Sequence, residues 1–176
     1  IRTDSQLKLI SDNFEYLKEI NRLEANGDVQ LFDLNNNITI NAQQIFYLKN
    51  EEKIFTVGKT LIKISNKYDI EGFDLILFKN KMILSSKKNA IITDNESNTY
   101  KLEQFQYSIN QEILKGENIV AITSDKENKS DEFFLKTGFF DLKKNEFLGK
   151  DIAANFHKDL FGDNENDPRI SAVSGF

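Results

Sequence analysis

The fold is decided by the stretch Leu23-Glu24-Ala25-Asn26-Gly27-Asp28-Val29-Gln30-Leu31, in which small or apolar residues alternate with polar ones. Alternation with a period of two is typical of a half-buried β-strand, because successive side chains point to opposite faces of a sheet. Further runs at 55–57, 61–64 and 119–122 are rich in β-branched and aromatic residues, which favour strands. The pattern predicts an all-β protein.

Polar clusters separate these runs. Asn and Asp tolerate left-handed backbone and bond to their own chain in turns, so each cluster predicts a hairpin turn. Residues 12–23 also show helical spacing, but the repeat described next assigns them to strands. The predicted turns are Asn35–Asn37, Lys49–Glu52, Asn66–Lys67, Asp94–Asn98 and Lys126–Ser130.

The sequence matches itself when it is shifted by 31 positions. Nine positions agree in size and character, and two glycines are in register. The aligned residues are Leu9, Ser11, Phe14, Tyr16, Leu23, Ala25, Gly27, Val29 and Leu31 with Ile40, Ala42, Ile45, Tyr47, Ile54, Thr56, Gly58, Thr60 and Ile62. Looser copies contain Leu102, Phe105, Tyr107, Ile113 and Gly116, and then Leu135, Gly138, Phe140, Phe147 and Gly149.

This repeat predicts a stacked architecture, because a unit of this length cannot bury its own apolar face. The three-residue step from Ala42 to Ile45 interrupts the period of two and predicts a β-bulge or corner. A repeated glycine is expected where the backbone bends. We therefore expect a two-sheet sandwich or flattened roll, elongated along the stacking axis, whose end strands offer free edges.

Composition excludes several classes of protein. The 176 residues suit one domain with a core, and a net charge of −5 argues against a nucleic-acid-binding face. No apolar run approaches the roughly 20 residues of a membrane-spanning helix. The absence of cysteine excludes disulfides and thiolate chemistry. The chain begins with Ile1 and not Met, so it is expected to be trimmed at its N-terminus.

No residue pattern favours catalysis. His157 is the only imidazole and is interpreted as a loop or surface residue, because no nucleophile motif or second ligand accompanies it. The acidic run Asp163–Pro168 lacks the glycine and the distal glutamate of an EF-hand loop and is interpreted as a turn or linker. Lys87-Lys88 and Lys143-Lys144 are interpreted as solvated turn residues. We expect no catalytic site, metal or cofactor, and hence no enzyme.

Two phrases of the repeat resemble signatures of the OstA-like lipopolysaccharide-transport family. Residues 23–31 resemble its "A-x-G-N-V" strand, and residues 40–47 resemble its "L-x-A-D-x-x-x-Y" segment. The tail Phe161–Ile170 is similar to the stretch that leads from the periplasmic domain of LptD into its outer-membrane barrel. The resemblance covers Leu7 to Phe176 and is strongest to the N-terminal domain of LptD, with LptA and LptC as alternatives.

This resemblance implies an open β-jelly roll, built from two twisted antiparallel sheets, that works without catalysis. Residues 1–160 would form the jelly roll, and residues 161–176 an acidic linker leading toward an outer-membrane β-barrel. The domain would lie in the periplasm as the soluble part of an outer-membrane protein. Its partners would be lipopolysaccharide, an LptA-like jelly roll joined by edge-strand pairing, and its own barrel with a lipoprotein plug. The lack of cysteine departs from those LptD proteins that tie this domain to their barrel with disulfides.

The resemblance also implies that lipid A acyl chains lie between the sheets. About 0.8 kcal/mol is gained per buried methylene, so a dozen methylenes would contribute on the order of 10 kcal/mol. The alternative is a closed β-sandwich that binds sugars or proteins through its Asn-rich turns, with the same residues as a packed core. The predicted lining is Phe14, Tyr16, Val29, Leu31, Ile40, Ile45, Tyr47, Ile54, Ile62, Ile64, Phe105 and Tyr107.

Overall fold

The computed structural model describes residues 6–124, 129–157 and 169–175, and it confirms the all-β prediction. No helix in this part of the chain is long and apolar enough to cross a membrane. Two single turns of 3₁₀-helix, at Lys18–Ile20 and Lys49–Glu51, occur between strands. The strands are β1 (Leu7–Ile10), β2 (Asn13–Leu17), β3 (Arg22–Asp33), β4 (Ile38–Leu48), β5 (Lys53–Ile64), β6 (Tyr68–Phe73), β7 (Ile76–Phe78), β8 (Ile83–Ser86), β9 (Ala90–Asp94), β10 (Thr99–Leu102), β11 (Gln104–Ser108), β12 (Ile113–Ser124), β13 (Ser130–Asp141), β14 (Glu146–Asn155) and β15 (Arg169–Gly175).

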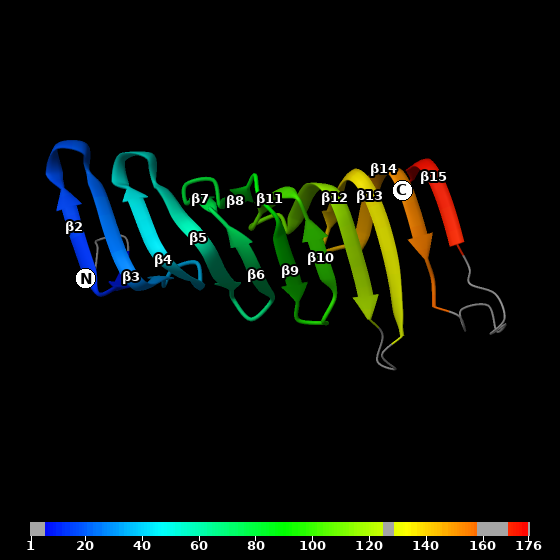
Figure 1. Ribbon diagram of the computed structural model, residues 1–176, viewed down its shortest axis with the longest axis horizontal. Helices are drawn as coiled ribbons and strands as arrows, with labels where there is room; N and C mark the ends of the chain where they lie inside the picture. Colours follow the sequence, from blue (N-terminus) through cyan, green and yellow to red (C-terminus); the bar gives the residue numbers. More distant parts are fainter. Residues whose placement is uncertain (1–5, 125–128, 158–168, 176) are drawn as a thin grey trace.

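The strands form one antiparallel meander that is elongated along the stacking direction (Figure 1). We call each complete crossing of the sheet a rung. The long strands β3, β4, β5, β12, β13 and β14 are single rungs. The pairs β1/β2, β6/β7, β8/β9 and β10/β11 are each one rung that is interrupted in the middle, because both members pair with the same neighbouring rungs.

Each rung bends at a corner near its midpoint. The register between β3 and β4 shifts between Asn26 and Val29, and that between β4 and β5 shifts at Ala42 and Gln44. The bulge predicted between Ala42 and Ile45 is therefore confirmed. Gly27 and Gly58 supply the corner of β3 and β5 with a φ of 79°, a backbone conformation that favours glycine.

Bending at the corner folds the sheet into two layers that cover each other. Layer A comprises β1, β6, β9 and β10, together with the second halves of β3, β5, β12 and β14 and the first halves of β4 and β13. Layer B comprises β2, β7, β8, β11 and the halves that lead to the turns at 18–21, 49–52, 79–82, 109–112 and 142–145. The two predicted sheets are thus two layers of one hydrogen-bonded sheet.

The 31-residue repeat corresponds to two successive rungs. Gly27 in β3 and Gly58 in β5 occupy the same corner two rungs apart. The turns of layer B follow the same spacing and bond to one another along the stack. The Lys49 amide donates to the Asn21 carbonyl at 3.0 Å, and the Leu142 amide donates to the Glu112 carbonyl at 2.9 Å. Each repeat therefore adds an equivalent pair of rungs.

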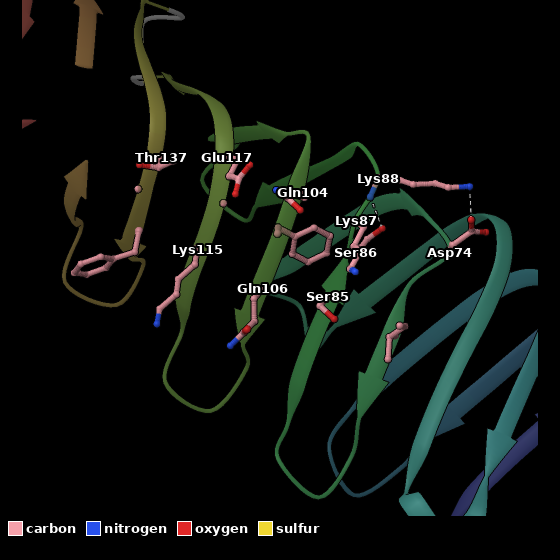
Figure 2. Close-up of a pocket in the computed structure, with 15 residues that line it drawn as sticks. Asp74, Ser85, Ser86, Lys87, Lys88, Gln104, Gln106, Lys115, Glu117 and Thr137 are labelled. Atoms are coloured by element: carbon pink, nitrogen blue, oxygen red, sulfur yellow. Dashed lines mark hydrogen bonds and ion pairs between the residues drawn. The ribbon is translucent and has the colours of Figure 1, made fainter. Parts of the chain in front are cut away.

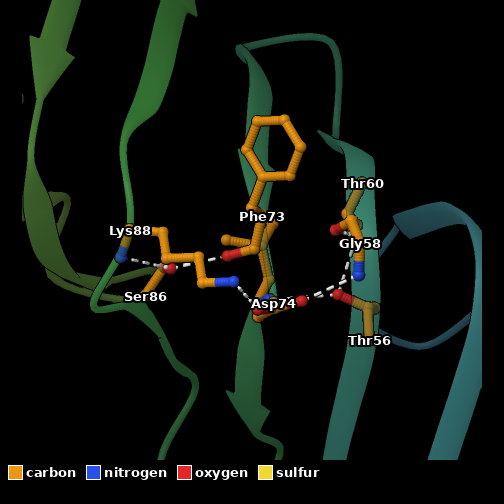
Figure 3. Close-up of polar contacts among 8 residues, drawn as sticks. Thr56, Gly58, Thr60, Phe73, Asp74, Ser86 and Lys88 are labelled. Carbon is orange, nitrogen blue, oxygen red and sulfur yellow. Dashed lines mark hydrogen bonds and ion pairs between the residues drawn. The ribbon is translucent and has the colours of Figure 1, made fainter.

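A polar network holds the corner where the rungs are interrupted (Figure 3). The Asp74 carboxylate, between β6 and β7, accepts a bond from the Gly58 amide at 2.7 Å and pairs with the Lys88 ammonium. The Thr56 hydroxyl accepts from the Leu75 amide at 3.0 Å. The Ser86 hydroxyl donates to the Phe73 carbonyl at 2.6 Å. Side chains thus bind backbone groups that an uninterrupted strand would have paired.

The last strand extends the sheet into the region that the sequence assigned to a linker. β15, from Arg169 to Gly175, pairs antiparallel with β14, so the sheet continues past residue 160. Their small and apolar residues Ile170 and Ala172 lie opposite Ala154 and Ile152 of β14, which explains the pairing. Residues 161–168 lie outside the described part of the chain.

Substitutions at Gly58 test the corner. A Cβ at this position meets no atom within 4 Å, so the cost of Gly58→Ala is the left-handed backbone alone, roughly 1–2 kcal/mol. Gly58→Asn should cost less, because Asn tolerates this backbone and Asn118 adopts a φ of 47° in β12. Urea unfolding measures both values. An equal loss for Ala and Asn would contradict this account.

Candidate functional site

Ten of the twelve predicted lining residues meet in one continuous apolar core between the layers. Their side chains are at most 5% exposed. The core continues from Leu7 in β1 to Ile152 in β14. The ten residues are Val29, Leu31, Ile40, Ile45, Tyr47, Ile54, Ile62, Ile64, Phe105 and Tyr107. The inward face was therefore identified correctly at these positions, and the layers are packed against each other along it.

Phe14 and Tyr16 differ from the other ten, since they are 54% and 42% exposed. Both lie on β2, which pairs only with β3 among the described strands. Phe14 lies opposite Ala25, which is fully buried, so the Phe14 ring continues the inward face. It is exposed because no further rung covers it. Ile170 on β15, opposite the buried Ala154, repeats this arrangement at the other end.

Opposite the corner, the turns of layer A meet the turns of layer B along a line that we call the seam. Its first contact joins Asp33, which precedes the 34–37 turn, to Lys79 in the 79–82 turn, with 3.4 Å between Nζ and Oδ2. Both side chains are largely buried, at 1% and 9% exposure. Asp33 also accepts from the amides of Asn35 and Asn36 at 3.2 and 3.3 Å. A buried pair with these additional bonds holds the two layers together.

The second contact of the seam centres on Glu112, in the 109–112 turn of layer B. Its carboxylate pairs with the Lys67 ammonium of layer A at 2.7 Å and accepts from the Tyr68 hydroxyl at 3.0 Å. The Lys67 hydrogen bond holds the pKa of Glu112 below its ordinary value, and burial raises that of Tyr68. The Tyr68 ring also meets the Tyr107 ring, with centroids 5.5 Å apart. No local sequence signal announces these residues.

The third position of the seam is a cleft of about 290 Å³. Its walls carry aromatic rings from both layers, with Tyr100 and Phe133 in layer A facing Phe140 and Phe147 in layer B. The centroids of Tyr100 and Phe140 are 5.3 Å apart, and those of Phe133 and Phe147 are 5.6 Å apart. Burial raises the pKa of the Tyr100 hydroxyl to about 12. At this cleft the interior reaches solvent between aromatic walls.

A larger hollow of about 840 Å³ lies on the outer face of layer B (Figure 2). Ile76, Ser85, Gln106, Lys115 and Phe139 form a cross-strand row through it. These side chains are of mixed polarity and lie on a broad, open surface. None of them pairs a nucleophile with a base. Phe105, one of the predicted lining residues, also borders this hollow, together with Ile76 and Phe139.

The residues considered for chemistry have structural partners. The His157 Nδ1 atom lies 2.8 Å from the Asp131 carboxylate, which also accepts from the His157 amide at 2.9 Å. The pair joins the end of β14 to the start of β13. Within the described ranges no three His, Asp or Glu side chains cluster so as to hold a metal ion. The acidic run Asp163–Pro168 lies outside those ranges.

Comparison with known proteins shows a likeness of fold. No protein-family model matches the sequence, and no curated protein matches it. Among solved structures, the chain is similar to the crystal structure of LptH, the LptA-homologous periplasmic component of the lipopolysaccharide transport device of Pseudomonas aeruginosa. The match has a TM-score of 0.57 and 15% sequence identity, and it covers 63% of this chain and 81% of LptH. The expected resemblance to the OstA-like proteins is thereby confirmed for the fold.

The second seam contact predicts a pH-dependent contribution to stability. Glu112→Gln should lower the free energy of unfolding by about 1 kcal/mol at neutral pH, since it removes the ion pair with the exposed Lys67. Because the pKa of Glu112 is depressed in the folded protein, its contribution is present above the ordinary value of 4.5 and is lost as the pH falls through the folded value.

Urea unfolding of the wild type and of Glu112→Gln across this pH range measures the difference. The matched control is Glu15→Gln on the exposed strand β2, which should change stability little at any pH. A difference for Glu112→Gln that stays constant into acid would show that the carboxylate charge is not what joins the layers.

Proposed function

We propose that this chain is a non-catalytic lipid-conduit module of the periplasm, which receives the acyl chains of lipopolysaccharide between its two layers and passes them on toward the outer membrane. One observation carries the proposal: the apolar interior continues through the described rungs from β1 to β14, and no described strand covers it beyond β2 or beyond β15. Phe14 at one end and Ile170 at the other are 54% and 57% exposed although they belong to the inward face.

The energetics of the interior fit a lipid cargo. The layers are packed together, so an acyl chain enters only if they separate, which breaks contacts such as that between the Tyr68 ring of layer A and the Tyr107 ring of layer B. The acyl chain replaces those contacts, and burying its methylenes contributes about 0.8 kcal/mol of favourable free energy each. The seam contacts at Asp33 and Glu112 oppose separation. A reversible balance of this kind suits a module that must also release its cargo.

The two ends of the roll suit association in series. β1 and β2 lie at one end and β15 at the other (Figure 1). Among the described strands, β2 pairs only with β3 and β15 only with β14, and an edge strand can pair with another jelly roll through its backbone. Joining two modules in this way would cover Phe14 and Ile170 and extend the apolar interior across the junction. The fold shared with LptH supports an LptA-like partner.

The finer assignment to the N-terminal domain of LptD rests on the similarity of the tail Phe161–Ile170 to the stretch that precedes the LptD barrel. In that assignment the module is the soluble part of an outer-membrane protein and hands lipopolysaccharide to its own β-barrel and lipoprotein plug. An LptA-like or LptC-like module would share the conduit and lack the barrel.

A second function is favoured by the packing itself. Inward residues such as Tyr107 and Ile45, at 0% and 1% exposure, leave no open groove. A closed sandwich that binds sugars or proteins through its Asn-rich turns would have the same interior.

Photo-crosslinking separates the two functions. Benzoylphenylalanine replaces the inward Tyr47, which is 5% exposed, or the outward and exposed Gln43 on the same strand, in cells that make lipopolysaccharide. The conduit predicts a lipopolysaccharide adduct at position 47 and none at 43. A folded protein without an adduct at 47, or with equal adducts at both positions, would rule out lipid between the layers and favour the closed module.

Association in series is tested at the exposed end. Phe14→Lys should weaken end-to-end association, of the chain with itself or with an LptA-like jelly roll, by about tenfold or more, because it places a charge where the partner's apolar interior would lie. Leu61→Lys is the control, since Leu61 is similarly exposed, at 45%, on the outer face in the middle of the roll. Sedimentation velocity over a concentration series compares the two, and an equal effect of both would refute end-to-end contact.

A further inference from the structure

We infer that the aromatic cleft formed by Tyr100, Phe133, Phe140 and Phe147 binds one linear saturated acyl chain and is the place where such a chain enters the roll from the side. The inference deepens the proposed function and rests on it for the source of the acyl chain. It assigns a specific subsite and an entry point to an interior that is otherwise closed along the described seam.

The seam has three positions, and two of them are held by charge. Asp33 with Lys79 forms the first and Lys67 with Glu112 the second. At each, opening the layers would leave a carboxylate and an ammonium without their partner, and at the first position both groups are buried. Separating a buried ion pair is costly, because each charge loses its partner while it is still shielded from water. These two positions therefore resist lateral entry.

The turn at the third position has the same backbone conformation as the turn at the second position, but it carries different side chains. Asn145 ends the 142–145 turn with a φ of 57°, as Glu112 ends the 109–112 turn with a φ of 56°, so the acid that pairs across the seam is replaced by a neutral amide. The nearby carboxylates serve their own turns. Asp94 accepts from the Asn98 amide at 2.9 Å, and Asp141 accepts from the Lys144 amide at 3.1 Å. Across the seam the contact is made by rings, Tyr100 against Phe140.

The cleft matches an acyl chain in size and chemistry. Its volume of about 290 Å³ suits a single extended chain, and the small, buried side chain of Ala121 leaves space at its floor. Aromatic rings in contact separate without leaving an unpaired charge, and an inserted aliphatic chain restores the lost dispersion contacts. The rim carries the polar side chains of Glu96, Asn98 and Glu146, whose oxygens accept bonds from hydroxyl groups. The rim thus suits the hydroxyl groups of a sugar head.

The test uses the absence of tryptophan from the chain. Phe147→Trp places a single fluorescent reporter in the cleft, and Phe55→Trp places one on the outer face, where Phe55 stacks on Phe46 at 4.7 Å. The probe is 10,11-dibromoundecanoyl maltoside below its micelle concentration, since bromine quenches tryptophan on contact. We expect saturable quenching of the cleft reporter, at least fivefold stronger than that of the outer reporter.

Two further measurements identify the site. Ala121→Leu in the Phe147→Trp background fills the floor of the cleft and should weaken quenching about tenfold, with circular dichroism to show that the fold is kept. If that variant does not fold, competition decides: unbrominated dodecyl maltoside should reverse the quenching and maltose should not. No quenching of the cleft reporter in a folded protein, or equal quenching of both reporters, would overturn the assignment.

Failure of this inference is distinguishable from failure of the proposed function. A lipopolysaccharide adduct at position 47 without quenching in the cleft would leave the conduit in place and remove the lateral entry. Saturable quenching in the cleft without an adduct at position 47 would support the acyl subsite and refute passage along the interior.

Discussion

The bend at the middle of each rung is the constraint on which the rest of the structure depends. A meander of alternating strands has one apolar face and no helix to cover it, so the sheet must cover itself. That is possible only if every rung turns at the same height, and in β3, β5, β12 and β14 the turn uses backbone outside the ordinary β region. Gly27 and Gly58 supply it with a φ of 79°, and Asn118 and Asp151 supply it in β12 and β14 with φ values of 47° and 50°. The layers, the core and the seam all follow from this line of corners.

The sequence predicted the features that repeat and missed those that occur once. The period of two and the shift of 31 positions were sufficient for the long strands, for the turns near 35–37, 49–52, 66–67 and 94–98, and for the bulge near Ala42, because each repeat restates the same physical requirement. The glycines of the looser copies were interpreted less well. Gly116 and Gly149 lie two residues before the corners, and each is packed against a leucine of the facing layer, where a Cβ would collide. A bend in these rungs is made by Asn118 and Asp151, which simple alignment of glycines does not reveal.

The seam was not predictable for a different reason. Its partners are separated by about 45 positions, as with Lys67 and Glu112, and carry no local motif. Their pairing depends on how far the two layers turn toward each other, which is a property of the folded sheet as a whole. The same holds for Phe14, whose inward direction followed from the repeat but whose exposure depends on its place in the final rung. Sequence periodicity therefore shows which side chains of a rung point inward. It says little about which rungs lie at the ends of the stack.

A stack of equivalent rungs is also a ruler. Neighbouring strands are spaced about 4.8 Å apart, so one repeat of two rungs spans about 10 Å along the axis. Gain or loss of one repeat would change the reach of the module by that step and leave both terminal edges, with their bonding groups and uncovered apolar residues, as they are. The distance that such a module bridges can thus be adjusted in discrete increments without altering how it joins its neighbours.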